Sequence, residues 1–205
     1  MTETMEDFLR RLGEASPAPG GGSAAALCGA IAASLAGMVA GLAMGKQGYE
    51  SVQLDCRDLA LKAEALRRRF VELVTLDEDA FVDVSLAYKM PKTSDSERLK
   101  RKEAIQHALR EATLVPLETM ERAVEALQVA QGALQKGARS AFTDAGAASL
   151  IAQSCLRAAS LNVAVNLASI EDSKFREESG ARSKALLERG AAVARALDDE
   201  VEKRF

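Results

Sequence analysis

Histidine is almost missing from this chain: there is one, His107, in 205 residues. Ser–His triads, Cys–His dyads and histidine-based zinc sites would all have to use that single residue. It lies in the charged segment Lys100–His107, which predicts a solvated helix face. We therefore expect no triad chemistry, no metal ligands and no metal cofactor.

Tryptophan is absent and aromatic residues make up only 4% of the chain, whereas hydrophobic residues make up 48%. This composition is typical of closely packed helices built on Ala, Leu and Val rather than of a sheet. The formal net charge of −3 lacks the basic footprint of nucleic-acid binding. The three cysteines are too far apart for a zinc or disulfide framework and predict buried thiols in a reducing compartment: Cys28, Cys56 and Cys155.

Helical periodicity dominates the chain, and no convincing alternating strand is found. We see no linker and no internal repeat. The prediction is an all-α fold, a single-domain (1–205) antiparallel helical bundle with a buried Ala/Gly-rich central helix. Ser94 to Glu97 form a capping box, and Pro116 is expected to kink or divide the helix that follows. The predicted helices cover about 5–12, 23–44, 50–89, 94–137, 144–170 and 183–204.

The segment Ala24–Met44 holds 21 uncharged residues, long enough to span a membrane. It is mostly Ala and Gly, which transfer poorly into lipid, and it lacks aromatic and basic anchors on its N-terminal side. We expect a helix buried by its neighbours or at a subunit interface. The first fifteen residues are acidic, so no signal peptide is expected, and the prediction is a soluble, cytoplasmic protein.

A proline- and glycine-rich stretch, Pro17 to Ser23, precedes this apolar helix. Successive glycines at a helix start let backbone N–H groups converge, and the helix dipole favours an anion there. The stretch Gly20, Gly21, Gly22 and Ser23 is thus a candidate ligand-binding site. The alternative is a flexible turn with Ser23 as an ordinary N-cap.

Asp77 stands on the apolar stripe of the long helix 50–89, between Leu73 and Phe81. A buried carboxylate is costly unless it is paired or its pKa rises, and such groups are candidates for general acid or base catalysis. The alternative is a structural pairing with a helix terminus or a lysine. Asp79 and Asp83 fall off the stripe and are expected to be solvated.

Other polar residues are weaker candidates. Asn162 and Asn166 share one helix face and either bind a polar heterocycle or tie helices together. Asp144 is an expected N-cap that can also face a ligand. Three lysines near helix ends could together meet an anionic ligand tail: Lys46, Lys89 and Lys92.

These segments together resemble the cyclodeaminase/cyclohydrolase family of one-carbon metabolism, which includes the C-terminal domain of formiminotransferase-cyclodeaminase and stand-alone methenyltetrahydrofolate cyclohydrolases. The resemblance runs in order over about residues 5–175. It rests on Pro17–Ala26, Gly45-Lys46, Tyr49-Glu50, Asp77, Ala80-Phe81, Met90–Thr93, Arg101, Val115–Leu117, Asp144–Gly146, Asn162-Val163 and Asn166-Leu167. The chain departs from the family where Ala138 replaces the usual Asn, Thr143 the usual Ser, and Gln47-Gly48 two lysines.

The resemblance implies a homodimer that binds a tetrahydrofolate, with or without a polyglutamate tail, and needs no other cofactor. The first expectation is hydrolysis of 5,10-methenyl-tetrahydrofolate to 10-formyl-tetrahydrofolate. The alternatives are a cyclodeaminase that releases ammonia from 5-formimino-tetrahydrofolate, and a non-catalytic folate-binding or assembly module, which the Ala138 replacement favours. The implied catalytic residues are Asp77, Lys92 and Asp144, and the implied substrate-binding residues are Gly20, Gly21, Gly22, Ser23, Lys46, Tyr49, Asn162 and Asn166.

Overall fold

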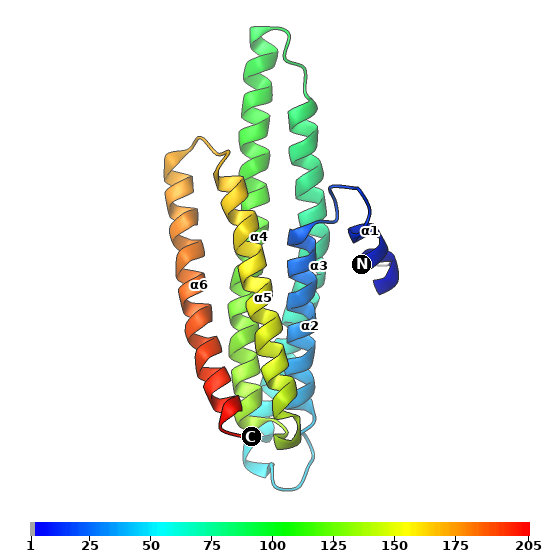
Figure 1. The fold of residues 1–205 in the computed structure, drawn as a ribbon, viewed down its shortest axis with the longest axis vertical. Coiled ribbons are helices and arrows are strands. Elements are labelled where there is room, and N and C mark those ends of the chain that lie inside the picture. The colour runs from blue at the N-terminus through cyan, green and yellow to red at the C-terminus, as the bar shows by residue number, and fades with distance from the viewer. Residues whose placement is uncertain (1–2) are drawn as a thin grey trace.

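The computed structural model describes residues 3–205, which form six α-helices and two single-turn 3₁₀ helices and contain no strand. The five long helices, α2 to α6, run alternately down and up as an antiparallel bundle (Figure 1). The all-α prediction is therefore confirmed. The bounds are α1 Met5–Leu12, α2 Gly21–Gly41, η1 Glu50–Val52, α3 Gln53–Lys89, α4 Asp95–Lys136, η2 Arg139–Ala141, α5 Phe142–Leu167 and α6 Ser173–Glu202.

The Ala/Gly-rich helix α2 is the central helix, and it packs against α3, α4 and α5. Its small residues allow close approach: a Cβ added to Gly29 would lie 2.3 Å from the ring of Phe70, which is completely buried. The helix begins at Gly21, with Gly20 as its N-cap, and not at Ser23 as expected. Ser23 is thus the third residue of the helix and not its cap.

Two segments are long and apolar enough to cross a membrane by length and composition: Gly21–Gly41 and Arg139–Leu167. Within the bundle, 56% of the first window and 39% of the second are buried. The expectation of a helix covered by its neighbours is confirmed for one side of α2. Its other side leaves Ile31 and Met38 exposed, and Leu42, the C-cap of the helix, is exposed as well.

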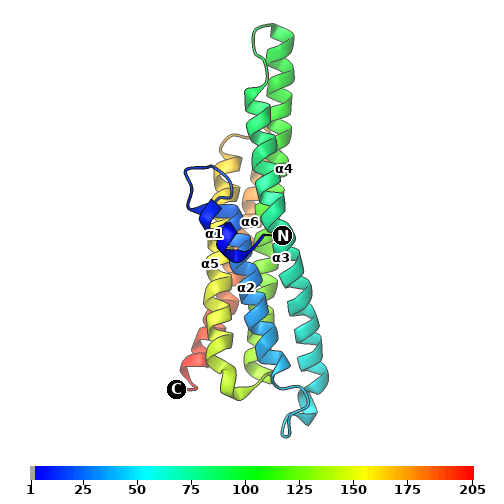
Figure 2. The ribbon, with the colours of Figure 1, turned by 90° about the vertical axis from the view of Figure 1, so that its right-hand side faces the viewer.

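The hairpin of α3 and α4 rises well above the other helices (Figures 1 and 2). The predicted capping box opens α4: Glu97 N donates to Ser94 Oγ at 3.2 Å, and Ser94 N donates to the Glu97 carboxylate at 2.9 Å. Pro116 does not divide this helix, which is continuous from Asp95 to Lys136.

A contact from α5 explains why the helix survives its proline. Pro116 has no N–H to donate to the carbonyl of Ala112, four residues earlier. Asn166 of α5 donates its Nδ2 to that carbonyl oxygen at 2.7 Å. The side-chain amide thus replaces the missing backbone hydrogen bond.

The C-terminal helices differ from the sequence prediction at their ends. α5 begins at Phe142, so Asp144 lies in its first turn and is not its cap, and it ends at Leu167 rather than near Ile170. α6 begins at Ser173, well before the predicted start near Ser183, because Asp172 accepts a hydrogen bond from Phe175 N at 3.1 Å. The sequence prediction missed this N-cap because Asp172 lies in a polar stretch without an apolar stripe.

Candidate functional site

Asp77 reaches from α3 to the first turn of α2. The hydroxyl of Ser23 donates to Asp77 Oδ2 at 2.7 Å. A Cβ added to Gly22 would lie 2.0 Å from Asp77 Oδ1, so only glycine leaves room for this carboxylate. The sequence brings these groups together because α2 and α3 are antiparallel and Gly22, Gly29 and Gly37 face α3 at about every second turn.

Two opposing effects act on the half-buried Asp77 carboxyl. Burial raises its pKa, and the hydrogen bonds from the side chain and backbone of Ser23 oppose that rise, leaving the pKa above its ordinary value. Between residues 3 and 205, no salt bridge compensates the charge. A carboxylate with a raised pKa and no cationic partner is suited to accept a proton or to face a cationic substrate.

The pairing of Asp77 with a helix terminus, the structural alternative considered from the sequence, is therefore present. The contact with Ser23 leaves part of the carboxylate accessible, because Asp77 remains partly exposed. The hydroxyl of Ser23, by contrast, is engaged with Asp77, and the residue is 0% exposed. Ser23 thus contacts a carboxylate of the protein itself.

The two asparagines of α5 have different environments. Asn162 stands beside the start of α2: its Nδ2 would lie 3.9 Å from a Cβ on Gly21. That nitrogen donates to Ala158 of its own helix at 3.1 Å. Asn166 ties α5 to α4 through the carbonyl of Ala112, so the interhelical alternative holds for Asn166, while Asn162 remains the candidate ligand contact.

Beyond Asp77, the apolar stripe of α3 is only partly covered by the bundle. Phe81 is 38% exposed, although its place on the apolar stripe predicted burial, and Tyr88 further along the helix is 47% exposed. The reason is that α2 begins at Gly21 and offers no cover further along α3. Phe81, one turn from Asp77, provides an apolar surface next to the carboxylate.

Four predicted site residues lie far from Asp77 within one chain. Lys92 follows the end of α3, and the twelve residues from Asp77 to Lys89 alone rise about 18 Å. Lys46 and Tyr49 follow the other end of α2, whose 21 residues span about 30 Å. There the Tyr49 hydroxyl accepts a hydrogen bond from Arg139 N at 2.9 Å. Asp144, in the first turn of α5, lies at that same end.

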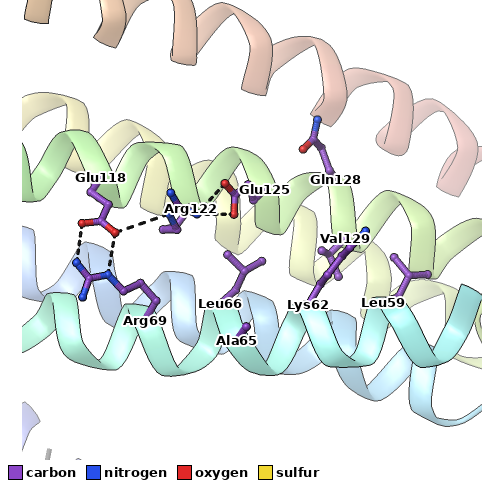
Figure 3. A pocket seen from close by; sticks show the side chains of 10 residues that line it. All are labelled: Leu59, Lys62, Ala65, Leu66, Arg69, Glu118, Arg122, Glu125, Gln128 and Val129. Atoms are coloured by element: carbon purple, nitrogen blue, oxygen red, sulfur yellow. Dashed lines mark hydrogen bonds and ion pairs between the residues drawn. The ribbon is translucent and has the colours of Figure 1, made fainter.

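A hollow of about 680 Å³ between α3 and α4 was not foreseen from the sequence (Figure 3). Four of its five charged side chains pair with one another: Arg69 binds Glu118 through two 2.7 Å hydrogen bonds, and Arg122 binds Glu125 at 2.8 Å. Lys62 also lines the hollow. Asp77 is not among its lining residues. The hollow is thus separate from the carboxylate site, and its ion pairs leave no strong signal for a ligand.

His107 is exposed on α4, as expected. Asp79 and Asp83 are exposed as well. In the part of the chain that the structure describes, no group of three or more His, Cys, Asp or Glu side chains is placed to hold a metal ion.

Several known proteins are similar to this chain in sequence, and a solved structure is similar to it in fold. The family model of formiminotransferase-cyclodeaminase matches residues 4–185. A methenyltetrahydrofolate cyclohydrolase of Methylorubrum extorquens is 38% identical, with 98% of this chain and 97% of the relative covered. A formimidoyltransferase-cyclodeaminase of Rattus norvegicus is 31% identical over 98% of this chain but only 37% of its own length.

The crystal structure of a formiminotetrahydrofolate cyclodeaminase from Thermotoga maritima superposes with a TM-score of 0.89 at 25% identity, covering 98% of this chain and 97% of that one. The helical bundle and the order of its helices are therefore shared with that enzyme. The sequence and structural matches agree over nearly the whole chain, and the protein belongs to the formiminotransferase-cyclodeaminase family.

Proposed function

We propose that this protein is a methenyltetrahydrofolate cyclohydrolase, which hydrolyses 5,10-methenyl-tetrahydrofolate to 10-formyl-tetrahydrofolate. One observation carries the proposal: Asp77, a half-buried carboxylate without a salt-bridge partner in the described residues, is held at the start of α2 in a chain that matches a cyclohydrolase from end to end. The substrate carries a cationic amidinium between N5 and N10. A carboxylate with no salt-bridge partner is suited to face that cation.

The reaction requires one proton to leave an attacking water. As the water oxygen bonds to the bridging carbon, Asp77 takes one of its protons and the positive charge of the amidinium disappears. The bond from the carbon to N5 then breaks, N5 takes up a proton, and the remaining hydroxyl loses its proton to become the formyl carbonyl. The net products are 10-formyl-tetrahydrofolate and one proton.

Other residues are proposed to bind the substrate. Asn162 lies beside Gly21, where its amide can contact a polar heterocycle, and Phe81 offers an apolar wall for a ring. Within one chain, Lys92, Lys46, Tyr49 and Asp144 are too distant to contact the same atoms as Asp77.

A homodimer would resolve this separation. The central helix α2 keeps Ile31, Met38 and Leu42 about 40% exposed, and α5 exposes Leu150, Leu161 and Val165 by 60% or more. Exposed apolar side chains on both helices favour burial against a second copy. Paired around a two-fold axis, one chain can bring its Lys46 and Tyr49 end toward Asp77 of its partner.

The test is the loss of the methenyl absorbance when enzyme is added to 5,10-methenyl-tetrahydrofolate. The proposal predicts hydrolysis well above the rate in buffer, and an unchanged rate with folded protein would refute it. The proposal includes a soluble, cytoplasmic enzyme that acts without a metal, so dialysis against a chelator should leave the rate unchanged.

A second candidate function is formiminotetrahydrofolate cyclodeaminase, which the structural match favours. Ammonia released from 5-formimino-tetrahydrofolate in place of methenyl hydrolysis would establish it. The third, a non-catalytic folate module, rested on Ala138. That residue is buried at the opposite end of the bundle from Asp77, where its N–H donates to Val39 O at 3.0 Å. Within one chain, its replacement therefore leaves the surroundings of Asp77 untouched.

A further inference from the structure

Ser23 and Asp77 are 54 residues apart in sequence and lie on different helices, yet they form one unit. Ser23 provides the one side-chain hydrogen bond that Asp77 receives in the described residues, at 2.7 Å. Ser23 is 0% exposed. A ligand cannot reach a fully buried hydroxyl, so a substrate-binding role for Ser23 conflicts with the geometry.

We propose that Ser23 is a positioning residue, which holds one oxygen of Asp77 at the start of α2 and so keeps the carboxylate ionised and in one orientation for catalysis. The inference rests on the proposed function, in which Asp77 accepts the proton. It assigns the glycine-serine signature at Gly22 and Ser23 to seating a catalytic carboxylate. The anion at this helix start is then part of the protein itself.

The start of α2 needs such a partner. Its first turn has no acidic residue, and its N-cap, Gly20, makes no side-chain hydrogen bond. The free N–H groups and the dipole of a helix N-terminus favour negative charge. Asp77 supplies that charge from α3, and Ser23 opposes the effect of burial on its pKa through both its side chain and its backbone.

Few other charges can act on Asp77. On α3, Glu78 is paired with Arg11 of α1 at 2.6 Å, and Asp79 is exposed. At about this height on α4, Arg110 is paired with Asp172 at 3.2 Å. Near Asp77, α2 and α5 present the uncharged Ser23 and Asn162. Ser23 is therefore the neighbouring side chain whose substitution should change the protonation state of Asp77 most.

The test compares Ser23→Ala with the wild type in two measurements. The first is the pH profile of kcat/KM for methenyl hydrolysis, whose acid limb should move up by about one pH unit, because a hydrogen bond to a charged group is worth roughly that much. The second is a carboxyl ¹³C NMR titration, with the Asp77 signal identified by its absence in Asp77→Asn. It should show the same direction of change without any substrate.

Ser34→Ala is the matched control: Ser34 is exposed on the same helix and its hydroxyl donates to Ala30 O at 2.8 Å. It should leave both measurements unchanged, while Ser23→Thr, which keeps a hydroxyl, should restore the wild-type acid limb. If Ser23→Ala lowers kcat/KM equally at every pH and leaves the NMR titration unchanged, the inference is wrong. A wild type without hydrolase activity refutes the proposed function instead, and the NMR titration still decides the role of Ser23.

Discussion

At the scale of single residues, Asp77 combines two properties that usually exclude one another. It is a carboxylate on the buried side of a long helix, and it has no cationic partner in the described chain. Ser23 and the space left by Gly22 make this arrangement tolerable. The residual cost of burial is what gives the carboxyl its raised pKa.

Asp77→Asn removes the proton acceptor and should lower kcat by about 10²- to 10⁴-fold, the usual contribution of a general base. In the wild type, kcat/KM should fall as the pH drops through the raised pKa of Asp77. Steady-state kinetics across pH measure both effects. An Asp77→Asn enzyme with the wild-type kcat would show that another residue is the base.

The same substitution has a predictable effect on stability. Because the pKa of Asp77 is raised on folding, its protonation stabilises the folded state below the ordinary aspartate pKa, and that stabilisation disappears as the pH rises through the raised value. The Tm of Asp77→Asn minus that of the wild type should therefore become more positive between pH 4 and pH 7. Calorimetry that gave the opposite trend would contradict a raised pKa.

Gly22→Ala should displace Asp77, since the new Cβ would lie 2.0 Å from Oδ1 and 2.6 Å from Cγ. We expect a loss of roughly 1–3 kcal/mol in the free energy of unfolding, together with a fall in kcat/KM. Gly21→Ala is the matched control, because its nearest neighbour, Asn162 Nδ2, is 3.9 Å away. Denaturant unfolding of the two variants should therefore separate clearly, and kinetics of Gly22→Ala against the wild type measure the fall in kcat/KM.

At the scale of helices, the bundle depends on contacts that compensate local defects. The proline in α4 is the clearest case, because Asn166 on another helix replaces the hydrogen bond that Pro116 cannot make. Of the kink or division predicted at Pro116, the division is wrong for this reason. A propensity argument considers one segment at a time, whereas the compensating amide lies 50 residues further along the chain.

Asn166→Ala should cost about 1–3 kcal/mol in the free energy of unfolding, because it leaves the Ala112 carbonyl without a partner. In a Pro116→Ala background, the restored N–H can donate to that carbonyl, so the cost should shrink. Denaturant unfolding of the double-mutant cycle measures the coupling. Equal costs in both backgrounds would show that Asn166 does not compensate the proline.

Asn162→Ala, by contrast, should raise KM with little change in stability.

At the scale of the whole molecule, the arrangement of the helices splits the predicted site. Asp77, Ser23 and Asn162 gather at one end of α2, and Lys46 and Tyr49 lie about 30 Å away at the other. The exposed apolar side chains of α2 and α5 favour a second copy that closes this distance.

Mixed dimers test that arrangement. Asp77→Asn and Tyr49→Phe are each expected to be nearly inactive. When the two are co-expressed, half of the dimers are mixed and each carries one intact site, so about one quarter of the wild-type activity should return. No recovery, with mixed dimers confirmed by mass spectrometry, would place the whole site in one chain.

Met38→Glu, on the exposed side of α2, should give monomers in light scattering.

The sequence by itself determined the all-α class, most helix bounds and the singular position of Asp77, because helical periodicity and a misplaced charge are local signals. It also supplied the family, through motifs whose order survives without any structure. Only the tertiary structure decided which polar residues meet. Ser23 contacts Asp77 and Asn166 contacts Ala112 because antiparallel packing joins positions more than 50 residues apart, and no local pattern encodes the register between two helices. The same packing separates Lys46, Tyr49, Lys92 and Asp144 from Asp77.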